Sequence, residues 1–219
     1  MTTDQIDRLP PHVQELARHA AELAPKRGFS PWLVLGLAFA ESNFGRALRN
    51  GSGDFIPRAC NPVRDARLKK TPLPGAVCRT LADGIPARKL KGPVAAWVPM
   101  AQGWGVGVFQ IDWESHHEFI ARGTWRDVRS CMDYALEVLE QARRHLSKAC
   151  GLRGDELLDA TVAAYNAGAG RVAKFVREDR SLDGATFHPG YVAKIKKKAD
   201  ELAGASGAWR SPTEGAANV

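Results

Sequence analysis

One stretch of this chain, residues 31–43, most constrains how the whole can fold. Ser30 and Pro31 supply a helix N-cap and a proline at the first helical position, and the helix that follows is apolar on nearly every face. Such a helix is stable only when other elements surround it, so we expect it at the centre of the domain. Its apolar run, residues 31–40, is too short to cross a membrane, and no run of about 18 or more apolar residues occurs. No transmembrane helix is therefore expected.

Further helices are predicted wherever apolar positions recur at helical spacing. Residues 12–26 show this spacing, and Gly28 ends the helix that they form. The other predicted helices cover residues 127–148, residues 155–166, a segment after Gly170, and residues 190–202. The predicted fold class is therefore mainly α.

The helical pattern is lost between residues 51 and 105. Prolines recur throughout this stretch and preclude long helices, and a long segment without periodicity is usually functional or flexible. We interpret residues 55–103 as an irregular insertion into one domain formed by residues 1–204. Residues 205–219 are rich in glycine, alanine, serine and proline, and this composition predicts a disordered tail.

The chain is basic, with a formal charge of +7 and a pI of about 9.4. A basic surface attracts polyanions, so nucleic acid, anionic lipid and an anionic cell wall all fit the charge. No nucleic-acid-binding motif accompanies the charge. The charge alone therefore does not choose a partner.

The four cysteines argue against a zinc site, because none of them forms a C-x-x-C pair. Cys131 and Cys150 lie on the same predicted helix, where nineteen residues would separate them by about 28 Å. A disulfide requires Cα atoms within about 7 Å, so these two should not pair. For Cys60 and Cys78, a disulfide within the insertion and two reduced thiols are both open.

Glu41 has the clearest potential for chemistry. It lies near the C-terminal end of the apolar helix, among hydrophobic neighbours. Burial and the negative potential of a helix C-terminus both disfavour the carboxylate, so we expect a raised pKa. An acid that stays protonated near neutral pH is what glycoside cleavage requires. The alternative is a helix-end glutamate paired with Arg46 or Arg49, and spacing alone favours that alternative.

Three segments, in order along the chain, resemble the motifs of one enzyme superfamily. Residues 41–54 resemble the catalytic segment of goose-type lysozymes and the Glu-Ser motif of the related soluble lytic transglycosylases. Residues 105–112 resemble their Gly-x-x-Gln motif, and residues 164–170 resemble their Ala-Tyr-Asn-Ala-Gly motif. Tyr191 resembles the closing tyrosine of these families. The resemblance covers roughly residues 29–54 and 103–202, and it does not cover the insertion.

The resemblance implies a two-lobed, lysozyme-like helical domain that cleaves the β-1,4 bond between N-acetylmuramic acid and N-acetylglucosamine. Glu41 would be the general acid. Asp54 and Asp112 match acidic positions that orient the attacking water in an inverting hydrolase. The residues implied to bind substrate are Ser42, Gly107, Gln110, Tyr165, Asn166 and Tyr191.

Each implied role has a competing local explanation. Asp54 follows Gly53, where aspartate is common in turns, and Asp112 stands where it would cap a helix near Trp113. Gly168 is also a normal helix C-terminus. At the level of function, a lytic transglycosylase would use the same Glu41 and release 1,6-anhydromuramic products. A non-catalytic wall-binding or structural module is the alternative of another class.

The resemblance also bears on partners and location. No metal and no organic cofactor are expected. The expected ligand is the glycan strand of peptidoglycan. The protein is expected to be a monomer that binds no nucleic acid and makes no integral membrane contact. Residues 1–10 carry charges and lack an apolar core, so they do not form a signal peptide. We expect synthesis in the cytoplasm and delivery to the wall by holin release, by a virion or by specialised secretion. Whether the chain also has a protein partner is open; the candidates are an immunity protein, an inhibitor, and a protein of a secretion system or a phage.

Overall fold

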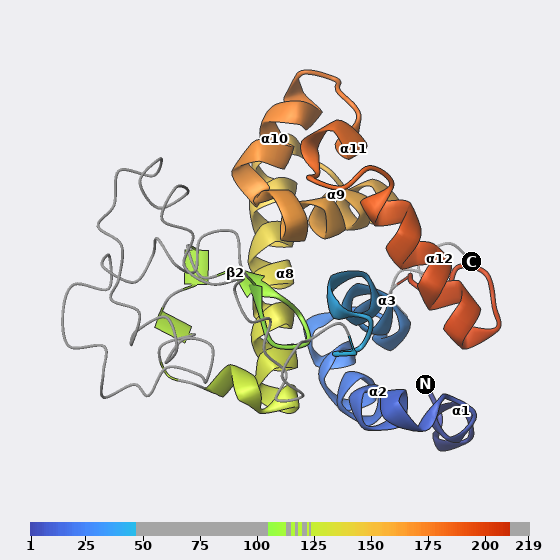
Figure 1. Ribbon diagram of the computed structural model, residues 1–219. Helices are drawn as coiled ribbons and strands as arrows, with labels where there is room; N and C mark the ends of the chain where they lie inside the picture. Colours follow the sequence, from blue (N-terminus) through green and yellow to red (C-terminus); the bar gives the residue numbers. More distant parts are fainter. Residues whose placement is uncertain (47–104, 113–114, 117, 120–121, 123, 211–219) are drawn as a thin grey trace. The chain divides into compact units, whose positions relative to one another are not determined.

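The computed structural model describes residues 1–46, 105–112, 115–116, 118–119, 122 and 124–210, and these residues are mainly α-helical (Figure 1). The predicted mainly α class is therefore confirmed. The chain divides into two units, one made of residues 1–40 and 132–219 and the other of residues 41–131. The predicted insertion at 55–103, together with Cys60 and Cys78, lies outside the described residues.

The first unit contains most of the helices. Its helices are α1 (Thr3–Asp7), α2 (Pro11–Leu23), the body of α3 (Pro31–Ser42), the body of α8 (Val128–Cys150), α9 (Gly154–Ala167), α10 (Ala169–Arg177), α11 (Leu182–Ala185) and α12 (Tyr191–Ala203). A 3₁₀ turn, η1 (Pro25–Arg27), follows α2 and ends at Gly28, which is left-handed with φ of 69°. The bounds of α2, α3, α8, α9, α10 and α12 lie close to predicted helices, whereas the short helices α1 and α11 were not predicted.

The helix α3 is the centre of this unit, as its sequence predicts. All residues from 31 to 38 are buried. The Ser30 hydroxyl oxygen accepts a hydrogen bond from the Trp32 amide at 3.3 Å, which is the expected N-cap, and also contacts the carbonyl of Ala208. Within the described ranges, no helix is both long enough and apolar enough to cross a bilayer.

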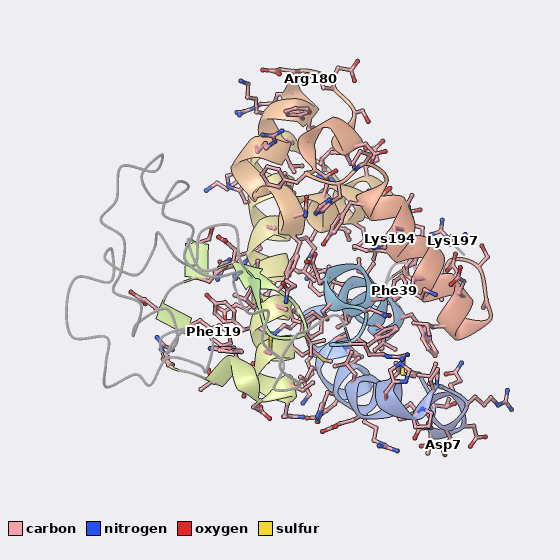
Figure 2. All side chains as sticks on the ribbon, in the orientation of Figure 1. Asp7, Phe39, Phe119, Arg180, Lys194 and Lys197 are labelled. Carbon is pink, nitrogen blue, oxygen red and sulfur yellow. The ribbon has the colours of Figure 1, made fainter. Side chains whose placement is uncertain are left out.

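The helix α12 packs closely against α3 at a glycine. A Cβ atom added to Gly36 would lie 2.5 Å from the backbone oxygen of Ile195, so only glycine permits this approach. Near the same crossing, Lys194 and Lys198 place their ammonium groups 5.5 and 4.4 Å from the ring centre of Phe39 (Figure 2). Close backbone packing and cation–π contacts thus join the two helices.

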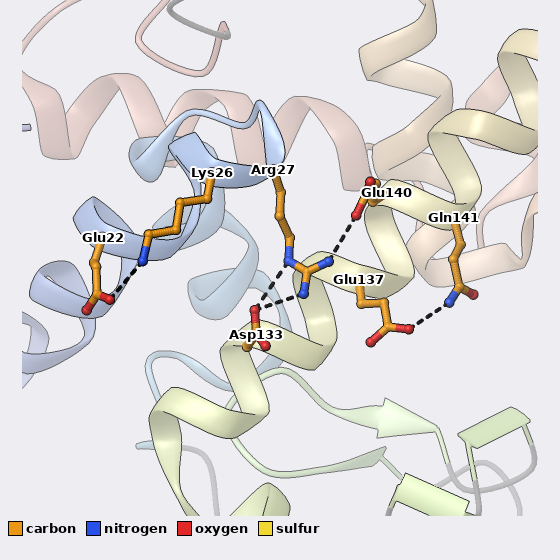
Figure 3. Close-up of polar contacts among 7 residues, drawn as sticks. All are labelled: Glu22, Lys26, Arg27, Asp133, Glu137, Glu140 and Gln141. Carbon is orange, nitrogen blue, oxygen red and sulfur yellow. Dashed lines mark hydrogen bonds and ion pairs between the residues drawn. The ribbon is translucent and has the colours of Figure 1, made fainter.

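The helix α8 is joined to η1 by ion pairs (Figure 3). The Arg27 guanidinium donates to Asp133 at 3.0 and 3.2 Å and to Glu140 at 2.9 Å. In return, Arg143 on α8 donates to the carbonyls of Arg27 and Gly28 at 2.7 and 3.0 Å. All of these contacts are partly buried, so they fix the register of α8 along the unit.

The helix α8 is also continuous from end to end, as predicted. Cys131 lies in its first turn and Cys150 is its last residue. Both are free thiols, so the prediction that they do not pair is confirmed.

The packed part of the chain extends beyond Gly204, where the composition placed the start of a disordered tail. Trp209 is only 5% exposed, and the Lys196 ammonium lies 3.7 Å from its ring centre. The Ala208 amide donates to Asp200 at 2.9 Å, and Arg210 forms an ion pair with Asp155. Residues 205–210 are therefore part of the first unit, and residues 211–219 lie outside the described part of the chain.

Candidate active site

Glu41 lies in the last turn of α3 and is the first residue of the second unit. Its side chain is half-buried. Directly after Ser42 the backbone becomes left-handed, with φ of 51° at Asn43, 57° at Phe44 and 85° at Gly45. Residues other than glycine adopt this conformation at a cost of about 1–2 kcal/mol, so the abrupt end of α3 stores strain beside Glu41.

Ser42 links the end of α3 to a second predicted motif. Its side chain is 2% exposed, and its hydroxyl donates to the Val108 carbonyl at 2.6 Å. The same oxygen accepts from the Gly45 amide at 2.8 Å. Both partners are backbone groups of the protein, so Ser42 positions the helix end that bears Glu41. Its implied contact with substrate stays a prediction.

The second motif forms a short β-hairpin. The strands β1 (Gly105–Val106) and β2 (Ile111–Asp112) are antiparallel, with Val106 opposite Ile111. Gln110 closes the loop between them, because its backbone amide and its side-chain Nε2 both donate to the Gly107 carbonyl, at 3.1 and 2.9 Å. Gln110 is half-buried and left-handed, with φ of 49°. Its side-chain nitrogen therefore shapes the loop.

Gly107 is required by packing within the second unit. Its φ is 68°, and a Cβ atom there would lie 2.8 Å from the Cys131 sulfur and 3.1 Å from the Trp125 carbonyl. The Cys131 thiol thus lies directly beneath the hairpin loop. Its burial raises its pKa to about 12, although backbone hydrogen bonds from Phe109 and Val108 act in the opposite direction. The resemblance implies that Gly107 binds substrate, which stays a prediction, and the packing around Cys131 and Trp125 is a separate reason for a glycine at this position.

Asp112 acts as a helix cap. Its Oδ2 accepts a hydrogen bond from the Ser115 amide at 2.9 Å, and residues 115 and 116 are helical. This is the local alternative that the sequence left open. Water positioning by Asp112 stays a prediction, and Asp54, its implied partner, lies outside the described residues.

The third motif belongs to the first unit, at the end of α9. Tyr165 and Asn166 are half-buried in the last turn of this helix. Gly168 has φ of 82°, and its amide donates to the Ala164 carbonyl at 2.8 Å. The predicted helix end at Gly168 is therefore confirmed.

A hydrogen bond connects this motif to the loop before α12. The Asn166 Oδ1 accepts from the Phe187 amide at 2.7 Å. Tyr191 is the first residue of α12 and is 4% exposed. The predicted site residues therefore fall into two groups, one around Glu41 and the hairpin in the second unit, and one around Asn166 and Tyr191 in the first.

Sequence reasoning missed two residues at these places. Cys131 fits the helical pattern of its neighbours, so no signal marks it as the residue beneath the hairpin loop. Phe187 is a single aromatic residue in a loop, and such a residue is most often packed, yet here it is 66% exposed. Among the residues that the structure describes, no cluster of three or more His, Cys, Asp or Glu side chains is arranged to hold a metal ion.

Comparison of the chain with models of known families, with curated proteins and with solved structures finds no match.

Proposed function

We propose that this chain is a peptidoglycan muramidase that hydrolyses the β-1,4 bond between N-acetylmuramic acid and N-acetylglucosamine. The observation that carries the proposal is the hydrogen bond from Ser42 to Val108, which spans 66 positions of sequence. It joins the segment that contains Glu41 to the Gly-x-x-Gln hairpin, the two segments that resemble neighbouring parts of a lysozyme catalytic centre.

In this proposal Glu41 donates a proton to the glycosidic oxygen as the bond to the leaving sugar breaks. Its place at the C-terminal end of α3 suits that role, because the partial negative charge of the helix carbonyls there favours the protonated carboxyl over the carboxylate. An inverting mechanism also needs a carboxylate base, about 6.5–9.5 Å from the acid, to activate a water on the opposite face of the sugar. Asp112 and Asp54 are the candidates for this base.

A lytic transglycosylase is the second candidate function, and one observation favours it. The contact that the structure shows for Asp112 is the helix cap from the Ser115 amide to Oδ2, which accounts for this aspartate without a water-positioning role. A transglycosylase needs no such second carboxylate, because the muramic acid's own 6-hydroxyl closes the anhydro ring and gives its proton to the Glu41 carboxylate that formed when the leaving oxygen was protonated. The same Glu41 would serve as the acid.

The test is the clearing of purified cell-wall sacculi by the wild type, by Glu41→Gln and by Glu15→Gln, which changes an exposed glutamate on α2. We expect Glu41→Gln to lower the rate at least about a hundredfold and Glu15→Gln to leave it unchanged. Equal clearing by all three proteins would refute the mechanism. Mass spectrometry of the products decides between the candidates, because reducing muramic ends indicate a hydrolase and 1,6-anhydro ends a transglycosylase. Binding of sacculi without any cleavage would indicate a wall-binding module.

A further inference from the structure

One large apolar side chain, Phe187, stands in solvent in the described part of the chain. It is 66% exposed and lies in the loop between α11 and α12. An exposed aromatic residue on a loose loop would mean little, because single apolar residues are common on surfaces. What distinguishes Phe187 is how firmly the loop around it is held.

The backbone is fixed on both sides of Phe187. Its own amide donates to Asn166 Oδ1 at 2.7 Å, which attaches it to the end of α9. The hydroxyl of the preceding residue, Thr186, lies 3.0 Å from the Asp183 carbonyl and 2.9 Å from the His188 carbonyl, and Thr186 is buried. The backbone that carries the ring is therefore held in place before any ligand arrives, which lowers the entropic cost of binding.

An arginine lies beside the ring. The guanidinium carbon of Arg171 is 5.4 Å from the ring centre of Phe187 and 5.5 Å from that of Phe175. The Arg171 Nε donates to the Ala185 carbonyl at 2.7 Å and one terminal nitrogen donates to the Gly184 carbonyl at 3.5 Å, which hold the guanidinium near both rings and leave its other terminal nitrogen for a ligand. A second guanidinium, that of Arg180 just beyond α10, lies 3.8 Å from the ring centre of Phe175. Phe187, Arg171, Phe175 and Arg180 thus alternate as ring and cation.

This arrangement combines two binding chemistries in one place. A flat aromatic face packs against the C–H face of a pyranose ring, and a planar guanidinium binds a carboxylate through paired hydrogen bonds. The group beside Phe187 is a guanidinium, that of Arg171, whereas Lys174 and Arg180 nearby in the sequence are each paired with Glu178, at 3.8 and 3.1 Å.

We propose that Phe187 is a stacking platform for a sugar ring and that Arg171 binds a carboxylate borne by the same glycan. The ligand class is a β-1,4-linked amino-sugar strand that carries carboxylates, such as the lactyl or peptide carboxylates on muramic acid. Asn166 is then a positioning residue, because it holds the Phe187 amide. This inference rests on the proposed function and names which part of its substrate the first unit recognises.

The test measures binding in a Glu41→Gln background, so that the ligand is not consumed. The two probes are a neutral chitooligosaccharide and soluble muramic-acid-containing fragments of glycan strands. Phe187→Ala should weaken binding of both probes about tenfold, whereas Phe187→Tyr, which keeps the ring, should bind as the parent does. Arg171→Gln should weaken binding of the carboxylated fragments alone. The control for Arg171→Gln is Lys197→Ala, which removes an exposed cation from α12, away from the Phe187 loop. Thermal unfolding checks that each variant is folded.

Two results would overturn the inference. One is unchanged binding of both probes by folded Phe187→Ala, and the other is full binding by Phe187→Leu, since leucine keeps an apolar surface without a flat face. Failure of the proposed function looks different, because wild type and Glu41→Gln would then clear sacculi equally while Phe187→Ala still lost glycan binding. If Glu41 proves essential and Phe187→Ala binds normally, the proposed function stands and this inference fails.

Discussion

At the scale of single residues, Ser42 is a small polar side chain that holds the end of α3 next to Glu41, the candidate general acid. Its hydroxyl is buried and satisfies one backbone acceptor and one backbone donor. Ser42→Ala would leave the Val108 carbonyl and the Gly45 amide without this partner. We therefore expect a loss of about 1–3 kcal/mol in the free energy of unfolding, measured by urea denaturation.

Ser42→Ala should also slow wall clearing more than it weakens glycan binding, because the change acts on the position of Glu41. Ser181→Ala, at an exposed helix cap of α11, is the comparison. A Ser42→Ala protein as stable and as active as the wild type would show that this link does not position Glu41.

The buried thiol beneath the hairpin loop gives a second prediction at this scale. Because the pKa of Cys131 is raised to about 12, roughly one molecule in ten thousand carries the reactive thiolate at pH 8. Iodoacetamide should therefore label the partly exposed Cys150 in the native protein long before Cys131. Peptide mass spectrometry follows both sites, and denaturant should remove the difference. Fast native labelling of Cys131 would show that the loop above it opens readily.

At the scale of elements, the crossing of α3 and α12 depends on Gly36. A methyl group there would meet the Ile195 backbone oxygen at 2.5 Å, and backbone cannot move aside as a flexible side chain can. Gly36→Ala should therefore lower the free energy of unfolding by about 1–3 kcal/mol despite the better helix propensity of alanine. Gly170→Ala is the matched control, because that helical glycine has no atom near its Cβ position and should gain up to about 1 kcal/mol. Urea denaturation of both variants checks the difference in sign.

The longer helices could be predicted because local sequence signals mark where they begin and end, whereas the short helices α1 and α11 were not predicted. Ser30 and Pro31 mark the start of α3, Gly28 the end of η1 and Gly168 the end of α9. The contacts that organise the candidate site could not be predicted in this way. The Ser42–Val108 and Asn166–Phe187 hydrogen bonds join positions 66 and 21 residues apart, and no periodicity encodes such a partner. Asp112 was predicted as either cap or water-positioning group, and only its cap contact is seen.

At the scale of the molecule, residues 205–210 show how composition can mislead about where a fold ends. Glycine, alanine and serine dominate this segment, yet a single tryptophan supplies enough apolar surface to hold it. Trp209→Ala should remove that contact and lower the free energy of unfolding by about 3–5 kcal/mol. Arg210→Ala, which removes an exposed ion pair with Asp155 and a cation–π contact 4.5 Å from the Trp209 ring centre but leaves the buried ring in place, should lower the free energy of unfolding far less. Equal effects of the two changes would contradict the anchoring role of Trp209.

The two serines at the ends of α3 also limit how this chain can vary. Ser30 caps the first turn and Ser42 is bonded at the last, so both ends of a 12-residue rod are pinned. Each inserted or deleted residue would rotate everything beyond it by about 100° and shift it by about 1.5 Å. We therefore expect the number of residues between these two serines to stay constant in related sequences, whereas the loops outside α3 can vary in length.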